Sequence, residues 1–431
     1  MSKRILLVVP RNDRAFSGNV RNGKCGMANL SLTTVASRVP DDWEVVYHDA
    51  RVSEVDFDSD VDVVGITAMT VQATDAYRIA DGFAEKGTPV LMGGMHPTAL
   101  PDEALEHADA VVAGEGEHVI ETALRDLEKG QMKGVYRAET LCEMKNMPTP
   151  RRDLLDRDMY VTGYYTIQAT RGCPYDCKYC AVTGVFGREF RMRPVEEVVD
   201  EISTFDGRHF FFVDDNICGK PAYAKELFSK LIPLRKTWGG QTSINFADDE
   251  ELLDLYARSG GKYAFIGLET ISEEGLKNLN KSWSKFGQYK EWIRKIHKAG
   301  INVLGSFIVG LDTDDSGVFD RMLKFCDEAG VDAAQFHILT PLPGTRLFEE
   351  MESTGRLLHR DWEKFHTGEC VIQPANMTAE ELEAGFYRLN REFYSIPRVL
   401  RRTFSRPRGI LCRASMNLGY RNRALRMPQN Q

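Results

Sequence analysis

Three cysteines at a CxxxCxxC spacing carry the strongest chemical signal in this sequence. Cys173, Cys177 and Cys180 lie in the segment TRGCPYDCKYCAV. Thiolates at this spacing can bind three irons of a [4Fe–4S] cluster and leave the fourth iron open for a ligand. Zinc is the alternative, but it favours a fourth Cys or His at finger spacing, and none follows nearby. The spacing therefore predicts an iron–sulfur site.

Carboxylates follow two apolar runs further along the chain. Asp214 and Asp215 end the run FFFVDD, and Glu269 ends FIGLE. A carboxylate buried at the end of an apolar strand is costly without a partner, so we expect a ligand amine or hydroxyl at Glu269. One of the two aspartates could instead cap the helix that follows.

A series of βα repeats must position these residues. Apolar runs alternate with amphipathic helical segments and predict a partial (β/α)6 barrel of the TIM type, with function at the carboxyl ends of its strands. The expected strands are 164–171, 209–215, 239–246, 263–269, 302–310 and 333–340. The cysteine segment directly follows the first of them.

An earlier βα series predicts a second α/β unit, a Rossmann-like doubly wound parallel sheet. Its expected strands are 5–10, 43–49, 61–68, 88–94 and 108–117, with helices at 28–39, 75–86 and 117–129. The strand ends read ITAMT, GGMHPT and AGEGE, and such small residues allow a ligand to approach closely.

The chain of 431 residues is long enough for two or three domains. We expect a Rossmann-like domain, a linker, the barrel, a helical C-terminal extension and a basic tail. Their predicted bounds are 1–135, 136–160, 161–345, 346–396 and 397–431.

Composition narrows the class of protein. Apolar residues make up 42% and charged residues 27% of the chain, and no apolar run is long enough to span a membrane. The N-terminal run reads as a buried strand and not as a secretory signal, which predicts a cytoplasmic protein. Nine cysteines in a reducing compartment favour metal binding over disulfides.

Charge is distributed unevenly. The net charge of −8 divides into +9 after Glu392, where nine arginines and no acidic residue occur, and −17 before it. An acidic body argues against nucleic acid as a partner. The basic tail, with apolar residues interleaved, could contact a membrane surface that carries a lipid substrate. A solvated or inter-domain tail is the alternative.

The cysteine segment, with Tyr179 before its last Cys, resembles the radical S-adenosylmethionine (SAM) superfamily. The resemblance implies that SAM binds the open iron and that one electron cleaves it to a 5′-deoxyadenosyl radical, with a ferredoxin or flavodoxin as electron donor. It also implies that the cysteines hold the cluster and that Tyr179, Asp214, Asp215, Glu269, Gly305, Gly310 and Leu339 bind cofactor around it. For the two glycines, relief of crowding in a strand is the alternative.

Joined to this barrel, the first domain resembles the cobalamin-binding domain of cobalamin-dependent radical SAM enzymes. The matching positions are Thr67, Met69, Gly93, Gly94, His96, Pro97, Gly114, Glu115, Gly116 and Glu117. Glycines there leave room for a flat corrin ring. The DxHxxG signature of proteins that ligate cobalt through His is missing, so we interpret His96 as a loop residue near the corrin. A degenerate sheet that binds only substrate is the alternative.

The C-terminal part resembles the extension of a cobalamin radical SAM group that includes hopanoid methylases, through segments such as PGT and RDWEKF. The six remaining cysteines show no second cluster spacing, which argues against a methylthiotransferase. The combined resemblance implies a methyltransferase that acts on an unactivated carbon of a small-molecule or lipid substrate. Radical oxidation, cyclisation or rearrangement without methyl transfer, and a non-catalytic metal-binding protein, are the alternatives.

Overall fold

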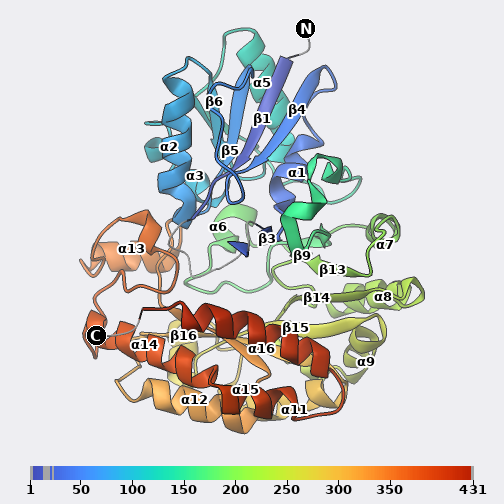
Figure 1. Ribbon diagram of the computed structural model, residues 1–431, viewed down its shortest axis with the longest axis vertical. Coiled ribbons are helices and arrows are strands. Elements are labelled where there is room, and N and C mark those ends of the chain that lie inside the picture. The colour runs from blue at the N-terminus through green and yellow to red at the C-terminus, as the bar shows by residue number, and fades with distance from the viewer. Residues whose placement is uncertain (1–2, 13–19, 22–23, 429–431) are drawn as a thin grey trace.

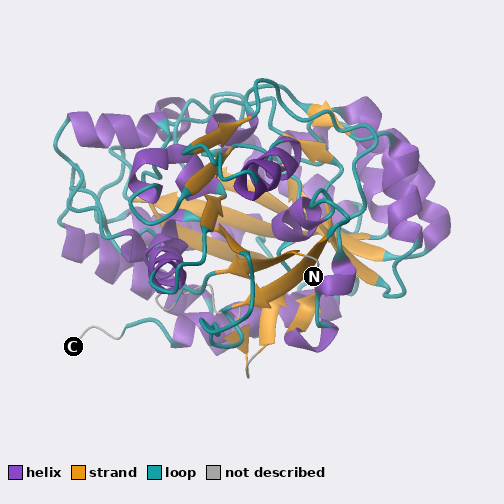
Figure 2. Cartoon of the chain, turned by 90° about the horizontal axis from the view of Figure 1, so that it is seen from above, coloured by secondary structure: helices purple, strands orange, loops and turns teal. Residues whose placement is uncertain are grey.

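The computed structural model describes residues 3–12, 20–21 and 24–428. Two parallel six-stranded sheets dominate it, one above the other in Figure 1. Helices lie on the outside of the strands when the molecule is viewed from above (Figure 2). The predicted α/β class, a Rossmann-like sheet followed by a partial barrel and a helical extension, is confirmed.

The first sheet has the strand order β4-β1-β5-β6-β7-β8, and every pairing in it is parallel. Its strands are β1 (Lys3–Val9), β4 (Trp43–Asp49), β5 (Val63–Thr67), β6 (Val90–Gly93), β7 (Ala110–Ala113) and β8 (Val135–Arg137). Its helices are α1 (Leu30–Ala36), α2 (Ala73–Ala84), α3 (Met95–Ala99), α4 (Pro101–Ala104) and α5 (Ile120–Glu128). The central strands are continuous apolar runs because helices cover both faces of the sheet.

Strand β8 was not among the expected strands. Its three residues, VYR, carry little apolar signal, and only Tyr136 among them is buried. The strand is stabilised by its pairing with β7, because the stability of an edge strand depends on its neighbours more than on its own residues.

The second sheet has the order β10-β13-β14-β15-β16-β17, also all parallel. Its strands are β10 (Thr166–Ile167), β13 (His209–Phe212), β14 (Thr237–Thr242), β15 (Gly261–Glu269), β16 (Asn302–Val309) and β17 (Ala333–Ile338). Its helices are α6 (Val182–Phe186), α7 (Val195–Ser203), α8 (Pro221–Leu231), α9 (Glu250–Arg258), α10 (Glu273–Asn278), α11 (Tyr289–Lys298) and α12 (Val318–Ala329).

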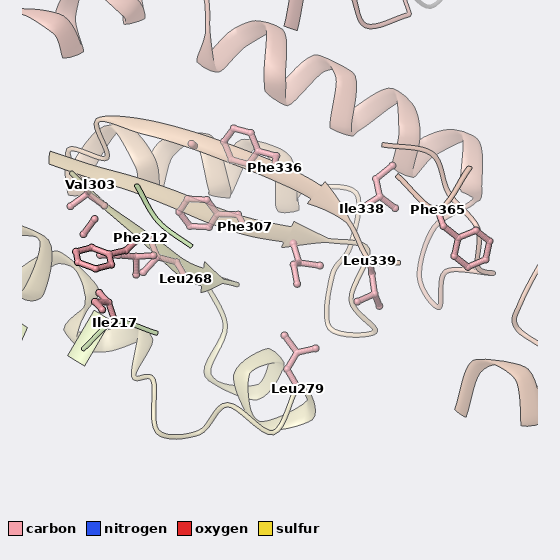
Figure 3. Close-up of a cluster of buried hydrophobic side chains, with 14 of the residues drawn as sticks. Phe212, Ile217, Leu268, Leu279, Val303, Phe307, Phe336, Ile338, Leu339 and Phe365 are labelled. Carbon is pink, nitrogen blue, oxygen red and sulfur yellow. The ribbon is translucent and has the colours of Figure 1, made fainter. Parts of the chain in front are cut away.

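Aromatic side chains fill the space between this sheet and its helices (Figure 3). Phe307 of β16 and Phe336 of β17 stack with their ring centroids 5.7 Å apart. Phe325 of α12 packs against Phe307, and Phe393 packs edge-on to Phe336. This rigid layer holds the strand ends, which carry the chemistry, in place.

The expected first barrel strand, 164–171, is divided in two. Only β10 joins the barrel sheet, whereas β11 (Thr170–Arg171) leaves it and pairs antiparallel with β12 (Arg191–Met192). The cysteine segment therefore lies between the two strands of a small ribbon. A further small sheet, β2 (Val20–Arg21), β3 (Lys24–Met27) and β9 (Tyr160–Gly163), lies between the two large sheets (Figure 1).

Four helices complete the chain: α13 (Arg346–Ser353), α14 (Ala379–Phe393), α15 (Ile396–Thr403) and α16 (Ile410–Leu425). A capping box starts α14, in which Thr378 and Glu381 bind each other's backbone N–H groups. The residues expected as a basic tail thus form two helices beside the barrel (Figure 1).

Candidate functional site

A large cavity lies between the two sheets, at the carboxyl ends of β5, β6 and β7. Its volume is about 1030 Å³, at the upper end of the range for ligand pockets. Eight of the ten expected cobalamin positions line it: Thr67, Met69, Gly93, Gly94, Gly114, Glu115, Gly116 and Glu117. The barrel supplies Arg171, Phe186 and Asp215 to the same wall. The cavity therefore belongs to both domains and suits a large ligand held between them.

His96 and Pro97 do not line this cavity. The His96 imidazole is fully buried, and its Nε2 lies 2.9 Å from the Tyr77 hydroxyl and 3.3 Å from Glu103 Oε1. Burial lowers the pKa of His96, against the raising effect of Glu103. Trp362 Nε1 donates to the same Glu103 oxygen at 2.7 Å. His96 therefore lies where the first domain meets the C-terminal extension, outside the cavity wall.

The glycines at the end of β6 line the cavity, and the backbone around them also requires glycine. Gly94 has φ of 97°, and a Cβ there would lie 2.8 Å from the backbone N and O of Ala68. A Cβ at Gly93 would lie 3.2 Å from the Val112 carbonyl oxygen. At both positions a side chain would point at neighbouring backbone, and glycine therefore allows the tight turn that forms the cavity floor.

Glu115 and Glu117 pair with arginines of the barrel. Because β11 and β12 run antiparallel, Arg171 lies opposite Arg191, and two like charges at such positions repel. Glu115 lies between them, with its two oxygens 2.8 Å from Arg171 Nη1 and 2.9 Å from Arg191 Nη1. Glu117 binds the other Arg171 nitrogen. All four side chains are buried, so the network fixes one domain against the other.

Burial of Glu115 raises the pKa of its carboxyl, but the hydrogen bonds from Arg191, the Cys142 N–H and Arg171 outweigh this effect and hold the pKa below its usual value. The carboxylate thus stays ionised. Neither arginine was predicted from the sequence, although Arg171 stands two residues before Cys173.

A second cavity, of about 280 Å³, lies at the carboxyl ends of the barrel strands. Its wall includes seven predicted residues: Cys173, Cys177, Tyr179, Cys180, Asp215, Glu269 and Leu339. Burial raises the pKa of the three thiols, that of Cys180 to about 12. Within the described ranges no group of three His, Cys, Asp or Glu is arranged to hold a metal ion as it stands. The shared wall suits a cluster, in which each thiolate binds a different iron.

Glu269 has a protein partner that the sequence did not predict. Its Oε1 accepts hydrogen bonds of 2.8 Å from both Lys281 Nζ and the Tyr179 hydroxyl. The Lys281 ammonium is buried, and it offsets part of the rise that burial causes in the pKa of the nearby Cys177 thiol. Glu269 also has φ of 63°, a strained conformation that non-glycine residues keep mainly at functional sites. Both residues line the cavity.

The two aspartates after β13 have different surroundings. Asp214 accepts hydrogen bonds from the backbone N–H groups of Ala169 and Thr170 and from the Thr170 hydroxyl, and it lines neither cavity. Asp215 lines both, and its Oδ2 has no hydrogen-bond partner among the described residues. Burial raises the pKa of Asp215 to about 6. A buried carboxylate oxygen of this kind needs a donor, which a ligand would supply.

The two glycines expected near adenine face away from this cavity. A Cβ at Gly305 would lie 2.9 Å from the Phe307 ring, in the layer between sheet and helices. At Gly310, where φ is 90°, it would meet Leu382 of α14 at 2.6 Å. Ser306 and Ile308 of β16 line the cavity instead. Relief of crowding therefore explains Gly305.

Two aromatic features of this cavity were also missed. Tyr175 and Trp283 stack at 3.6 Å between centroids and 11° between planes. His337 Nδ1 lies 2.8 Å from the hydroxyl of Thr367, a residue of the C-terminal extension. Burial lowers the pKa of His337 to about 3, so the imidazole is neutral. These residues are far apart in sequence, and only the fold brings them together.

The two cavities meet, because Val182 and Asp215 line both. A Rossmann-like sheet with a large ligand cavity thus faces a barrel with three thiols at its strand ends, an arrangement that suits an enzyme with two adjoining ligand sites. Comparisons with known proteins agree: residues 167–338 match the radical SAM superfamily, and residues 20–124 match the B12 binding domain.

Relatives and solved structures extend this match over nearly the whole chain. Bacteriochlorophyllide d C-12(1)-methyltransferase of Chlorobaculum tepidum is 34% identical over 417 residues, 94% of this chain and 90% of its own. Hopanoid C-2 methylase of Rhodopseudomonas palustris is 27% identical over 84% of this chain and 72% of its own. The cobalamin-dependent SAM radical enzyme OxsB, solved with aqua-cobalamin and SAM, has the same fold, with a TM-score of 0.70, 16% identity, and coverage of 98% of this chain and 72% of its own.

The chain therefore belongs to the cobalamin-dependent radical SAM methyltransferases. Its cofactors are a [4Fe–4S] cluster, SAM and cobalamin. In the part of the chain that is described, no helix combines the length and the apolar character needed to cross a membrane.

Proposed function

We propose that this methyltransferase acts on an unactivated carbon of a tetrapyrrole. The observation that carries the reaction class is the meeting of the two cavities at Asp215 and Val182, which puts a methyl donor beside a radical site. The tetrapyrrole class rests on the relative with 34% identity, whose name gives bacteriochlorophyllide d as its substrate. A hopanoid is the second candidate, supported by the hopanoid C-2 methylase.

We assign cobalamin to residues 1–135 and the cluster with SAM to residues 161–345. When bound, the cluster and SAM supply a 5′-deoxyadenosyl radical and cobalamin carries the methyl group. Cys173, Cys177 and Cys180 bind the cluster. The electron comes from a donor such as a ferredoxin or flavodoxin.

Around the cluster, three groups orient SAM. Asp215 accepts a hydrogen bond at its free Oδ2. Glu269, held by Tyr179 and Lys281, offers a fixed anionic site whose backbone strain is maintained by those contacts. Leu339 provides an apolar wall. Burial of these groups excludes water, which protects a reactive radical from side reactions.

The arginine–glutamate network has a positioning role in this proposal. Arg171 reaches from the cysteine ribbon to Glu115 and Glu117 of the first domain. It thereby holds the two domains at a fixed separation, and reacting groups held in this way react faster than mobile ones.

Anaerobic reconstitution with iron, sulfide and cobalamin, followed by incubation with SAM, a reductant and bacteriochlorophyllide d, tests the proposal. We expect a product heavier by one methyl group, together with 5′-deoxyadenosine and S-adenosylhomocysteine, all detected by mass spectrometry. The variant Cys173→Ala serves as the control and should give none of them. Methylation of a hopanoid but not of the tetrapyrrole would overturn the substrate class. Deoxyadenosine without S-adenosylhomocysteine would overturn methyl transfer.

A further inference from the structure

The last two helices carry an unusual concentration of exposed apolar side chains. Eleven large apolar residues are exposed among those that the structure describes, and six of them lie between residues 396 and 425. They are Ile396, Leu400 and Phe404 at α15, and Leu411, Leu418 and Leu425 on α16. Leu411 is 86% exposed and Phe404 66%. Single exposed apolar residues are common, but a contiguous group indicates an interaction surface.

Their spacing places them in one stripe on each helix. Ile396, Leu400 and Phe404 are four residues apart, and Leu411, Leu418 and Leu425 are seven apart. Both spacings return to the same helical face. We name these six side chains the apolar stripes.

The opposite faces of the two helices are buried together. Arg402 of α15 donates to Asn417 Oδ1 of α16 at 2.8 Å, and both side chains are buried. Asn417 Nδ2 donates in turn to the backbone oxygen of Asp332, just before β17. The apolar stripes therefore lie on the exposed side of these two helices, and the helices themselves lie beside the barrel (Figure 1).

Further buried polar contacts hold the helix pair to the barrel. Arg413, fully buried, binds the Thr403 and Arg408 carbonyl oxygens and the Asn302 side chain. Asp332 also binds Arg406. Asn302 is the first residue of β16, and Asp332 directly precedes β17. The helix pair is thus a preformed surface at the amino-terminal end of the strands, opposite the two cavities.

Charge indicates what this surface binds. Residues 393–431 contain nine arginines and no acidic residue. The carboxylates that face them from the barrel are Asp327, which binds Arg398 and Arg401, and Asp332. Glu392, at the end of α14, binds Arg388. Arg408 and Arg426 are exposed, and they stand close to Leu411 and Leu425 in sequence, so cations flank the apolar stripe of α16.

We propose that α15 and α16 form a peripheral docking surface for a membrane rich in anionic phospholipid. The apolar stripes enter the boundary between headgroups and acyl chains, and the arginines bind lipid phosphates. A second copy of the chain would place like charges against each other, which disfavours self-association through this face. The proposal does not depend on which substrate is methylated.

Vesicle flotation of the reconstituted, full-length enzyme under anaerobic conditions tests this proposal. We expect the enzyme to float with vesicles of phosphatidylcholine mixed with phosphatidylglycerol, to stay behind with phosphatidylcholine alone, and to be released by high salt. The double variant Leu411→Glu and Leu418→Glu should bind at least ~10-fold more weakly, because it places anions in the interface. Both leucines are exposed, so its unfolding temperature and SAM cleavage should equal those of the parent.

Leu358→Glu is the matched control, since Leu358 is 46% exposed but lies outside the two helices. It should float like the parent. Failure of the parent to bind anionic vesicles, or equal binding of the double variant, would overturn the proposal. A dimer of the parent that the double variant converts to a monomer, without vesicle binding, would also overturn it and would show that a second copy covers this face.

Discussion

The two cavities that meet at Asp215 are built from different parts of the chain. The first has a floor of backbone turns at Gly93, Gly94 and Gly114, and the charged side chains of Glu115, Glu117 and Arg171 in its wall are paired with one another. The second has walls of thiol, carboxylate, ammonium and aromatic groups. The difference follows from the ligands: a large planar cofactor is bound by shape, whereas a metal cluster requires particular donor atoms. Changes of backbone geometry should therefore harm the first cavity most, and changes of chemical group the second.

The largest effect is expected from Cys173→Ala. Loss of one of three thiolates should abolish cluster assembly and SAM cleavage, because no other group in the motif replaces the donor. Iron content and the cluster's visible absorbance measure it. Cys412→Ala removes a partly exposed thiol on α16, outside both cavities, and should leave both unchanged. Full iron content in Cys173→Ala would refute the assignment.

Glu115→Gln probes the boundary between the two cavities. It leaves Arg171 and Arg191 facing each other without their shared anion, and removing one partner of a buried ion pair costs about 3–5 kcal/mol. The unfolding temperature should fall accordingly at pH 7. The pKa of Glu115 is lowered in the folded protein, so its contribution is present above about pH 4.5 and is lost as the pH falls below that value.

The difference in unfolding temperature between Glu115→Gln and the parent should therefore shrink on acidification. Glu121→Gln, a change of the same kind in the first turn of α5, is the control and should change little at either pH. A difference that is constant from pH 7 to pH 4 would contradict the role given to the ion pairs.

Gly94→Ala tests the backbone character of the first cavity. A non-glycine residue at φ of 97°, with its Cβ 2.8 Å from Ala68 atoms, should cost about 3 kcal/mol and reduce cobalamin binding. Corrin absorbance after desalting measures the binding. Gly130→Ala is the matched control, since Gly130 also has a positive φ but has open space around it. Both variants should still bind SAM. Loss of SAM binding in Gly94→Ala alone would contradict the assignment of this glycine to the first cavity only.

The smallest effect is expected from Gly305→Ala. Its added methyl group meets the Phe307 ring edge in the packing layer, which should cost about 1 kcal/mol through overpacking. The affinity for SAM, measured by equilibrium dialysis, should equal that of the parent because Gly305 does not line the cavity. A weaker affinity of Gly305→Ala for SAM would show instead that this glycine contributes to the SAM site.

Local patterns predicted the parts of this protein that depend on neighbours in sequence. The parallel strands were predicted because burial on both faces demands continuous apolar runs, and the cysteines because their spacing spans a few residues. Strand β8 was not predicted because it is stabilised by pairing with β7 and not by its own sequence. Asp214 and Asp215 could not be distinguished, since adjacent residues in an extended segment point to opposite sides.

Glu269 also shows that contacts between residues far apart in sequence cannot be predicted from local patterns. The sequence indicated that its carboxylate needs a partner, but Lys281 lies 12 residues further on, and the distance between the two charges is decided by the loop after β15. His96 was placed near the corrin by its position in GGMHPT, whereas packing against Tyr77 and Trp362 directs it to the other side of α3.

The sequence by itself determined the order of the two α/β units, the three cluster thiols and the uneven charge of the chain, because each is a local or compositional property. Tertiary structure alone decided that Glu115 lies between two arginines and that Asp215 lines both cavities. It also decided that some of the C-terminal arginines make buried contacts, while apolar side chains near them are exposed. These features depend on which side of an element a residue occupies and on what packs against it, and that is settled only when the whole chain is folded.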